Sequence, residues 1–113
     1  MLQVTEVKDA RVFYCPSLIE DAYETLLKDI VWSQGQVFVA GQWRNEARLT
    51  CLLADALGKE YIYAGKKMWA APFPESVIAI REKVHKAVHD VYPDINFDTC
   101  LCDYYEDGNK SIG

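Results

Sequence analysis

The run from residue 95 to residue 105 restricts the fold of this chain more than any other segment. Apolar residues occupy every second position from Ile95 to Leu101, and this period of two is typical of a β-strand with one inward face. Asp103 and Tyr105 continue the same face. Buried polar groups need hydrogen-bonding partners. We therefore expect this carboxylate and phenol either to bond locally, to each other or to the turn that follows, or to line a pocket for a polar ligand.

Two helices and several shorter strands are expected before this run. The first helix spans residues 17–30, where Ser17 and Glu20 have the spacing of a capping box. The second follows Pro72-Phe73-Pro74, with Pro74 at its first position. Strands are indicated at 11–14, 36–39, 48–53 and 61–63, and Ala40-Gly41 predicts a hairpin that resumes at Trp43. These elements indicate an α+β fold.

Length and charge narrow the class of protein. The 113 residues, 50% of them hydrophobic, are enough for a single domain with its own core. A net charge of -5 disfavours a general nucleic-acid binder, although Arg44 with Arg48 and Lys66 with Lys67 form local basic spots. No signal peptide or membrane span is expected.

The cysteines match neither a zinc site nor a disulfide framework. A single residue separates Cys100 from Cys102, and Cys15 and Cys51 are distant from them. Buried free thiols are the simpler interpretation, and they indicate an intracellular protein, in the cytoplasm or nucleus.

Two further patterns have a functional and a structural interpretation. His85 and His89, with Glu82 one turn earlier, have a metal-binding spacing, but an exposed helix face is the more common explanation. Tyr61 and Tyr63 share one strand face, so they could stack on nucleic-acid bases. Tyrosines in this pattern are more often core residues.

Several segments, taken in order, resemble the AlkB family of iron(II)- and 2-oxoglutarate-dependent dioxygenases. They are Arg48-Leu49-Thr50, Tyr61 to Gly65, Pro72-Phe73-Pro74 before a helix, and Phe97 to Gly113. The resemblance runs from about Val37 to the last residue. It implies a double-stranded β-helix (jelly roll), of which this chain holds an N-terminal extension (1–35), a nucleotide-recognition lid (36–70), and a support helix with the first barrel strand (71–113).

The resemblance also implies an activity and roles for five residues. The family oxidatively demethylates N-alkylated bases in nucleic acid, using Fe(II) and 2-oxoglutarate. Tyr105 resembles the tyrosine that binds the 2-oxoglutarate carboxylate, with Asp103 beside it. Tyr61 and Tyr63 resemble the residues that contact the flipped base, and Arg48 resembles a basic residue near the nucleic-acid backbone. The iron ligands are absent from this chain and are expected just after Gly113.

The chain departs from the family pattern at three positions. Asp103 stands where the family usually has Asn. A carboxylate 4 Å from the cosubstrate carboxylate costs up to about 4 kcal/mol at an effective dielectric of 20, unless it is protonated or turned away. Ala47 precedes Arg48 where Pro is common. Ala40 stands where a duplex-probing relative has a bulky aromatic residue, which favours single-stranded DNA or RNA as the substrate.

Two alternatives remain open from the sequence. The chain could be a non-catalytic module that binds nucleic acid or a partner, or a generic α+β domain whose tyrosines are all core. In any incomplete barrel the strand edges are open, so we also expect self-association through them.

Overall fold

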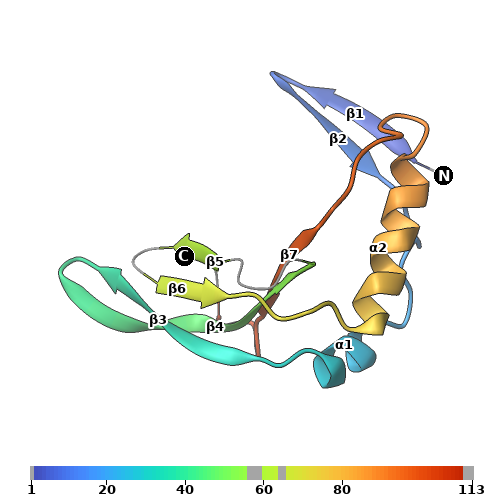
Figure 1. The fold of residues 1–113 in the computed structure, drawn as a ribbon. Helices are drawn as coiled ribbons and strands as arrows, with labels where there is room; N and C mark the ends of the chain where they lie inside the picture. Colours follow the sequence, from blue (N-terminus) through green and yellow to red (C-terminus); the bar gives the residue numbers. More distant parts are fainter. Residues whose placement is uncertain (1, 56–59, 64–65, 111–113) are drawn as a thin grey trace.

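The computed structural model describes residues 2–55, 60–63 and 66–110 as an α+β fold (Figure 1). The side chains of Glu60, Tyr61, Tyr63 and Lys66 lie outside this description. The elements in chain order are β1 (Gln3–Val7), β2 (Ala10–Tyr14), α1 (Tyr23–Asp29), β3 (Ser33–Val39), β4 (Gln42–Ala54), β5 (Glu60–Tyr63), β6 (Lys66–Trp69), α2 (Glu75–Val88) and β7 (Thr99–Tyr104). The α+β prediction is confirmed, and among these elements no sheet closes or curls.

A three-stranded antiparallel sheet, ordered β3-β4-β7, is the centre of the molecule. The 13-residue strand β4 pairs with β3 on one side and, through Leu49–Ala54, with β7 on the other. β4 continues past Thr50, the partner of the first residue of β3, and there Ala71 exchanges backbone hydrogen bonds of 2.9 Å with Leu52 and Ala54. β1 with β2 and β5 with β6 form two separate hairpins. The other parts of the central sheet are therefore assembled on β4.

The core lies on the cysteine face of this sheet. Cys51 and Leu53 of β4 form a buried cluster with Ile30, at the end of α1, and Val77 of α2. Cys100 and Cys102 pack against the same cluster. The prediction that the face of Leu101 points inward is wrong for β7, where Leu101 is 41% exposed. The reason is that the helices contact the opposite face.

The molecule exposes more surface than a compact domain of its mass. Its accessible area is 8321 Å², whereas a folded monomer of this size exposes about 6,300 Å². Figure 1 shows the β1–β2 hairpin and the tip of the β3–β4 hairpin projecting in different directions from the helices. The predicted core is thus present but small. Among the described residues, its buried hydrophobic members are Ile30, Cys51, Leu52, Leu53, Ala54 and Val77.

The first helix begins later than the sequence pattern predicts. Ser17 and Asp21 have φ angles of 58° and 53°, which are left-handed and incompatible with a continuing α-helix. α1 therefore starts at Tyr23, after Ala22, and the expected capping box is not formed. Its end near Ile30 is as predicted.

α2 agrees more closely with the prediction. Pro74 immediately precedes the helix as its N-cap, one position before the place expected for it. Val77 is buried, and Ile80 and Val84 are half-buried, so the predicted apolar face does contact the rest of the protein. Glu75 lies in the first turn, where a negative charge stabilises the helix dipole.

The strand predicted at 95–105 is shorter in the structure, and two strands were missed. β7 begins only at Thr99, because Thr99 pairs with Ala54, the last residue of β4. The Phe97 N–H donates instead to the His85 side chain, 3.0 Å away. β1 and β6 were not predicted, since neither has a strictly alternating apolar pattern. The strands expected at 11–14, 36–39, 48–53 and 61–63 lie within β2, β3, β4 and β5.

The turn at Ala40-Gly41 gives a prediction about stability. Both residues have positive φ angles, 52° and 75°, as a two-residue type I′ hairpin requires. Alanine is strained there, so Ala40→Asn should raise the free energy of unfolding by about 1 kcal/mol. Urea denaturation would measure this change. Gly41→Ala is the control: an added Cβ meets no atom within 4 Å, so any loss reports backbone strain alone. An unchanged Ala40→Asn variant would contradict the assigned turn.

The sheet edges give a second prediction. β3 and β7 are the outer strands, and no other described strand pairs with their outer sides. Open edges pair with other chains, so the purified protein should self-associate as its concentration rises. Sedimentation equilibrium over a hundredfold concentration range would test this, and a constant monomer mass would refute it.

Candidate functional site

One face of β4 carries buried polar side chains. Glu46, Arg48 and Thr50 alternate along the strand, so they share a face, and they are 5%, 8% and 1% exposed. Asp103 of β7 lies directly opposite Thr50 in the ladder. We call these four residues the polar layer. Burying such groups is unfavourable unless they pair with one another.

The polar layer is held by ion pairs centred on Arg48. Arg48 Nε donates a hydrogen bond of 3.1 Å to Asp103 Oδ1, and Arg48 Nη2 lies 3.8 Å from Glu46 Oε1. Burial alone would lower the pKa of Arg48, but the charge and hydrogen bond of Asp103, with Glu46 and Tyr105, raise that pKa above its ordinary value. Arg48 therefore remains a cation beside two acidic groups.

The structure brings together three of the predicted site residues, Arg48, Asp103 and Tyr105. Asp103 has 24% of its side chain exposed, and Tyr105 is half-buried and near enough to affect the pKa of Arg48. Neither residue lies in bulk solvent. The phosphate contact predicted for Arg48 would compete with its hydrogen bond to Asp103. For Tyr61 and Tyr63 the structure describes only the backbone, in β5, and their predicted base contacts fall outside the described side chains.

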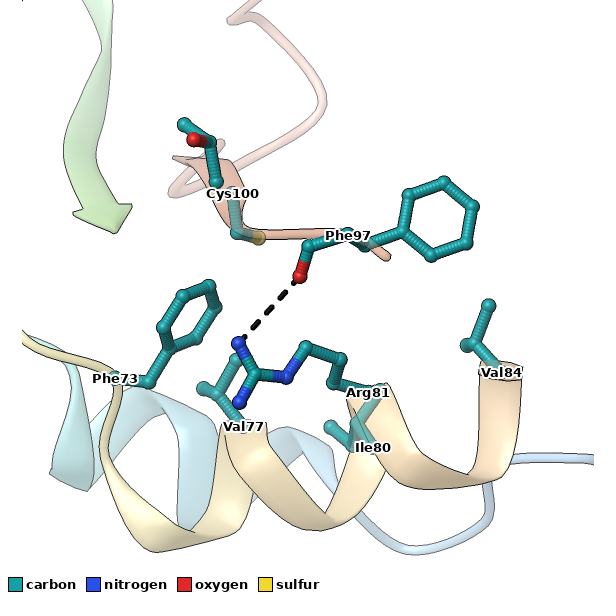
Figure 2. A pocket seen from close by; sticks show the side chains of 8 residues that line it. Phe73, Val77, Ile80, Arg81, Val84, Phe97 and Cys100 are labelled. Carbon is teal, nitrogen blue, oxygen red and sulfur yellow. Dashed lines mark hydrogen bonds between the residues drawn. The ribbon is translucent and has the colours of Figure 1, made fainter. Parts of the chain in front are cut away.

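An apolar cavity of about 230 Å³ lies between α2 and the segment that enters β7 (Figure 2). Arg81 crosses it: the guanidinium carbon lies 4.5 Å from the centroid of the Phe73 ring, and Nη1 donates to the Phe97 carbonyl at 3.4 Å. The same Nη1 contacts both carboxylate oxygens of Asp55, at 2.9 and 3.0 Å. The Asp55 carboxylate therefore neutralises the positive charge of Arg81. The wall of the cavity consists of Phe73, Val77, Ile80, Arg81, Val84, Phe97, Thr99 and Cys100.

The two histidines have different environments. His85 Nε2 accepts the backbone hydrogen bond from Phe97, and the two rings stack with centroids 5.5 Å apart. His89 is exposed, as the helix-face interpretation predicts, but His85 is half-buried and anchors the chain before β7. In the part of the chain that the structure describes, no three His, Cys, Asp or Glu side chains are placed to hold a metal ion.

The tip of the β3–β4 hairpin carries an aromatic pair that the sequence interpretation missed. Phe38 and Trp43 are directly opposite in the register, with ring centroids 5.3 Å apart, and they are 49% and 57% exposed. Arg44 is exposed next to them. We call Phe38 and Trp43 the aromatic tip. Their symmetric placement around the Ala40-Gly41 turn is the signal that predicts such a pair.

Comparison with models of known protein families found no match, and a search of curated proteins found no similar chain. As for membranes, neither helix in the described ranges is long and apolar enough to cross a bilayer.

The polar layer gives a prediction about stability. Arg48→Ala should lower the free energy of unfolding by about 3–5 kcal/mol, because it removes the cation of a buried ion pair that compensates the charges of Asp103 and Glu46. Asp103→Asn should cost less, about 1 kcal/mol, since this side chain is partly exposed and an amide oxygen can still accept from Arg48. Urea denaturation of both variants would measure the difference. Equal losses would show that Arg48 does not compensate Glu46.

Proposed function

We propose that this chain forms the nucleotide-recognition lid, the support helix and the first barrel strand of an AlkB-like 2-oxoglutarate-dependent dioxygenase. The reaction would be oxidative demethylation of N-alkylated bases in single-stranded DNA or RNA. The observation that carries this proposal is the buried polar layer beside Tyr105. It lies on the sheet face opposite to the helices, where the inside of a jelly-roll barrel would hold a polar cosubstrate.

The Arg48–Asp103 pair supports this assignment at the position where the sequence departs from the family. An unpaired carboxylate would repel a 2-oxoglutarate carboxylate by about 4 kcal/mol at 4 Å. Arg48 lies 3.1 Å from Asp103 and offsets that charge. The Tyr105 hydroxyl would then donate a hydrogen bond to the cosubstrate, with Arg48 and Asp103 keeping the strand end in place.

The residues that the structure describes do not by themselves fit an iron site. Both histidines are on or at the end of α2, and the Nε2 of His85 is occupied by the Phe97 N–H. We therefore assign binding and positioning roles to this chain, and no chemical step. The iron ligands are expected in the sequence that follows Gly113. The coding region beyond that position should encode His-x-Asp within a few residues, and its absence would overturn the enzyme assignment.

The aromatic tip supports nucleic acid as the substrate. Exposed aromatic rings stack on unpaired bases, and an adjacent arginine attracts the phosphate backbone. In the turn that joins the two strands, Ala40 is too small to wedge between base pairs. A base must leave its stack to reach a dioxygenase centre, and this step costs least in a single strand.

The same aromatic tip favours a second candidate function. Phe38, Trp43 and Arg44 could bind single-stranded nucleic acid without any reaction, as in a non-catalytic module. Such a module would not distinguish an alkylated base from a normal one, because stacking alone tolerates every base.

Oligonucleotide binding tests the proposed substrate. Trp43→Ala should weaken binding of a single-stranded oligonucleotide with one N1-methyladenine about 5- to 160-fold, which corresponds to about 1–3 kcal/mol for one stacked base. Fluorescence anisotropy at two salt concentrations would measure it. The control is Tyr14→Ala, which removes a similarly exposed ring, 59% accessible, from the β1–β2 hairpin.

The outcomes separate the candidates. Tighter binding of the methylated strand than of the unmodified one supports the dioxygenase assignment. Equal affinities favour the non-catalytic module. If neither strand binds at low salt, or if Tyr14→Ala weakens binding as much as Trp43→Ala, the proposed nucleic-acid site is wrong.

A further inference from the structure

Two sulfur atoms lie close together on the core face of β7. Cys100 and Cys102 are two residues apart on an extended strand, so their side chains point to the same face. Their Sγ atoms are 3.7 Å apart. The structure describes all four cysteines of the chain, and none forms a disulfide.

Both sulfurs adjoin cavities that small molecules can enter. Cys100 lines the 230 Å³ cavity beside α2, on the wall across from Phe73 and Val77 (Figure 2). Cys100 and Cys102 together line a second cavity, of about 290 Å³, between β7 and α1. Both residues are half-buried, whereas Cys51 is buried. A molecule of the size of hydrogen peroxide can therefore reach the pair.

The two thiols differ in acidity. The hydrogen bond from Cys102 lowers the pKa of Cys100 to about 7, although burial opposes this shift. The hydrogen bond to Cys100 raises the pKa of Cys102, which therefore keeps its proton. Burial also raises the pKa of Cys51. Since the thiolate is the reactive form, Cys100 is the expected nucleophile at neutral pH.

We propose that Cys100 and Cys102 form a redox-active dithiol that a hydroperoxide converts to an intrachain disulfide. The Cys100 thiolate attacks one oxygen of hydrogen peroxide, the O–O bond breaks, and a sulfenic acid forms with release of hydroxide. The Cys102 sulfur then attacks the Cys100 sulfur, and the S–O bond breaks. Hydroxide leaves and takes up the Cys102 proton as water. The peroxide gains two electrons and the two thiols lose them.

The strand geometry makes this disulfide easy to reduce. Residues i and i+2 of a strand have Cα atoms about 6.6 Å apart, near the upper limit of the disulfide range. Bringing the two Cα atoms to the more usual separation of about 5.5–6 Å would bend β7 at Leu101 and disturb its pairing with Leu52. A strained bond of this kind has a high reduction potential and exchanges readily with dithiols. This proposal does not depend on the dioxygenase assignment.

Peptide mapping of the whole chain tests the proposal without any substitution. Both cysteines fall in one tryptic peptide, residues 87–110, and Cys51 falls in another, residues 49–59. After one equivalent of hydrogen peroxide and alkylation of the remaining thiols, the 87–110 peptide should carry no alkyl group and weigh two hydrogens less than its reduced form. Dithiothreitol should reverse this. A disulfide between the two peptides, or oxidation only to sulfinic acid, would overturn the proposal.

Two substitutions of Cys102 separate the acid–base role from the covalent one. Cys102→Ser keeps a hydrogen-bond donor, so Cys100 should react with iodoacetamide at pH 7 nearly as before. After hydrogen peroxide is added to this variant, the Cys100 sulfenic acid should accumulate, because no second thiol resolves it, and dimedone should trap it. Cys102→Ala removes the donor, so alkylation of Cys100 should slow about fivefold. Equal rates in both variants, with both folded by circular dichroism, would contradict the assigned hydrogen bond. Cys15→Ser, outside the pair, should leave disulfide formation unchanged, and a loss there would also overturn the assignment.

Discussion

The antiparallel ladder between β4 and β7 joins segments that lie about fifty residues apart in the sequence. It pairs Leu49–Ala54 with Thr99–Tyr104, residue by residue. Through this ladder Asp103 reaches Arg48, and the cysteines of β7 reach the buried cluster around Leu53 and Val77. A shift of one residue in the register would exchange the two faces of β7 and remove both arrangements. The candidate sites therefore depend on this pairing before they depend on any side chain.

The two faces of the sheet have opposite chemistry because side chains alternate along a strand. One face holds the polar layer, where one arginine neutralises carboxylates. The other holds sulfur and aliphatic groups under the helices. Cys102 and Asp103 are neighbours in the chain, so a covalent change at the thiol would move the backbone that positions the carboxylate. The two proposals are independent in their chemistry, but this shared peptide couples them mechanically.

Because the core is small, it leaves much apolar surface exposed in the rest of the molecule. Many large hydrophobic side chains remain exposed, including Val31 at 80% and Trp69 at 64%. Apolar surface of this extent is typical of proteins that contact further polypeptide or a ligand. The buried residues concentrate at the end of β4, where Leu53 and Ala54 are each 1% exposed. Much of the buried apolar surface therefore belongs to β4, where Cys51 and Leu53 face the helices and Leu52 and Ala54 are buried on the opposite side.

The sequence by itself determined the elements whose signals are local. Pro74 marked the start of α2, Ala40-Gly41 marked the hairpin turn, and the alternation after Ile95 marked β7. It could not determine which face of β7 meets the helices. Phe97 and Leu101 are more hydrophobic than Cys100 and Cys102, so the local pattern predicts that the face of Leu101 is buried, whereas the cysteines pack against the core. Only the tertiary structure decided that face, and with it the partner of Arg48. Ion pairs and covering elements come from residues far apart in the chain, and local patterns do not record them.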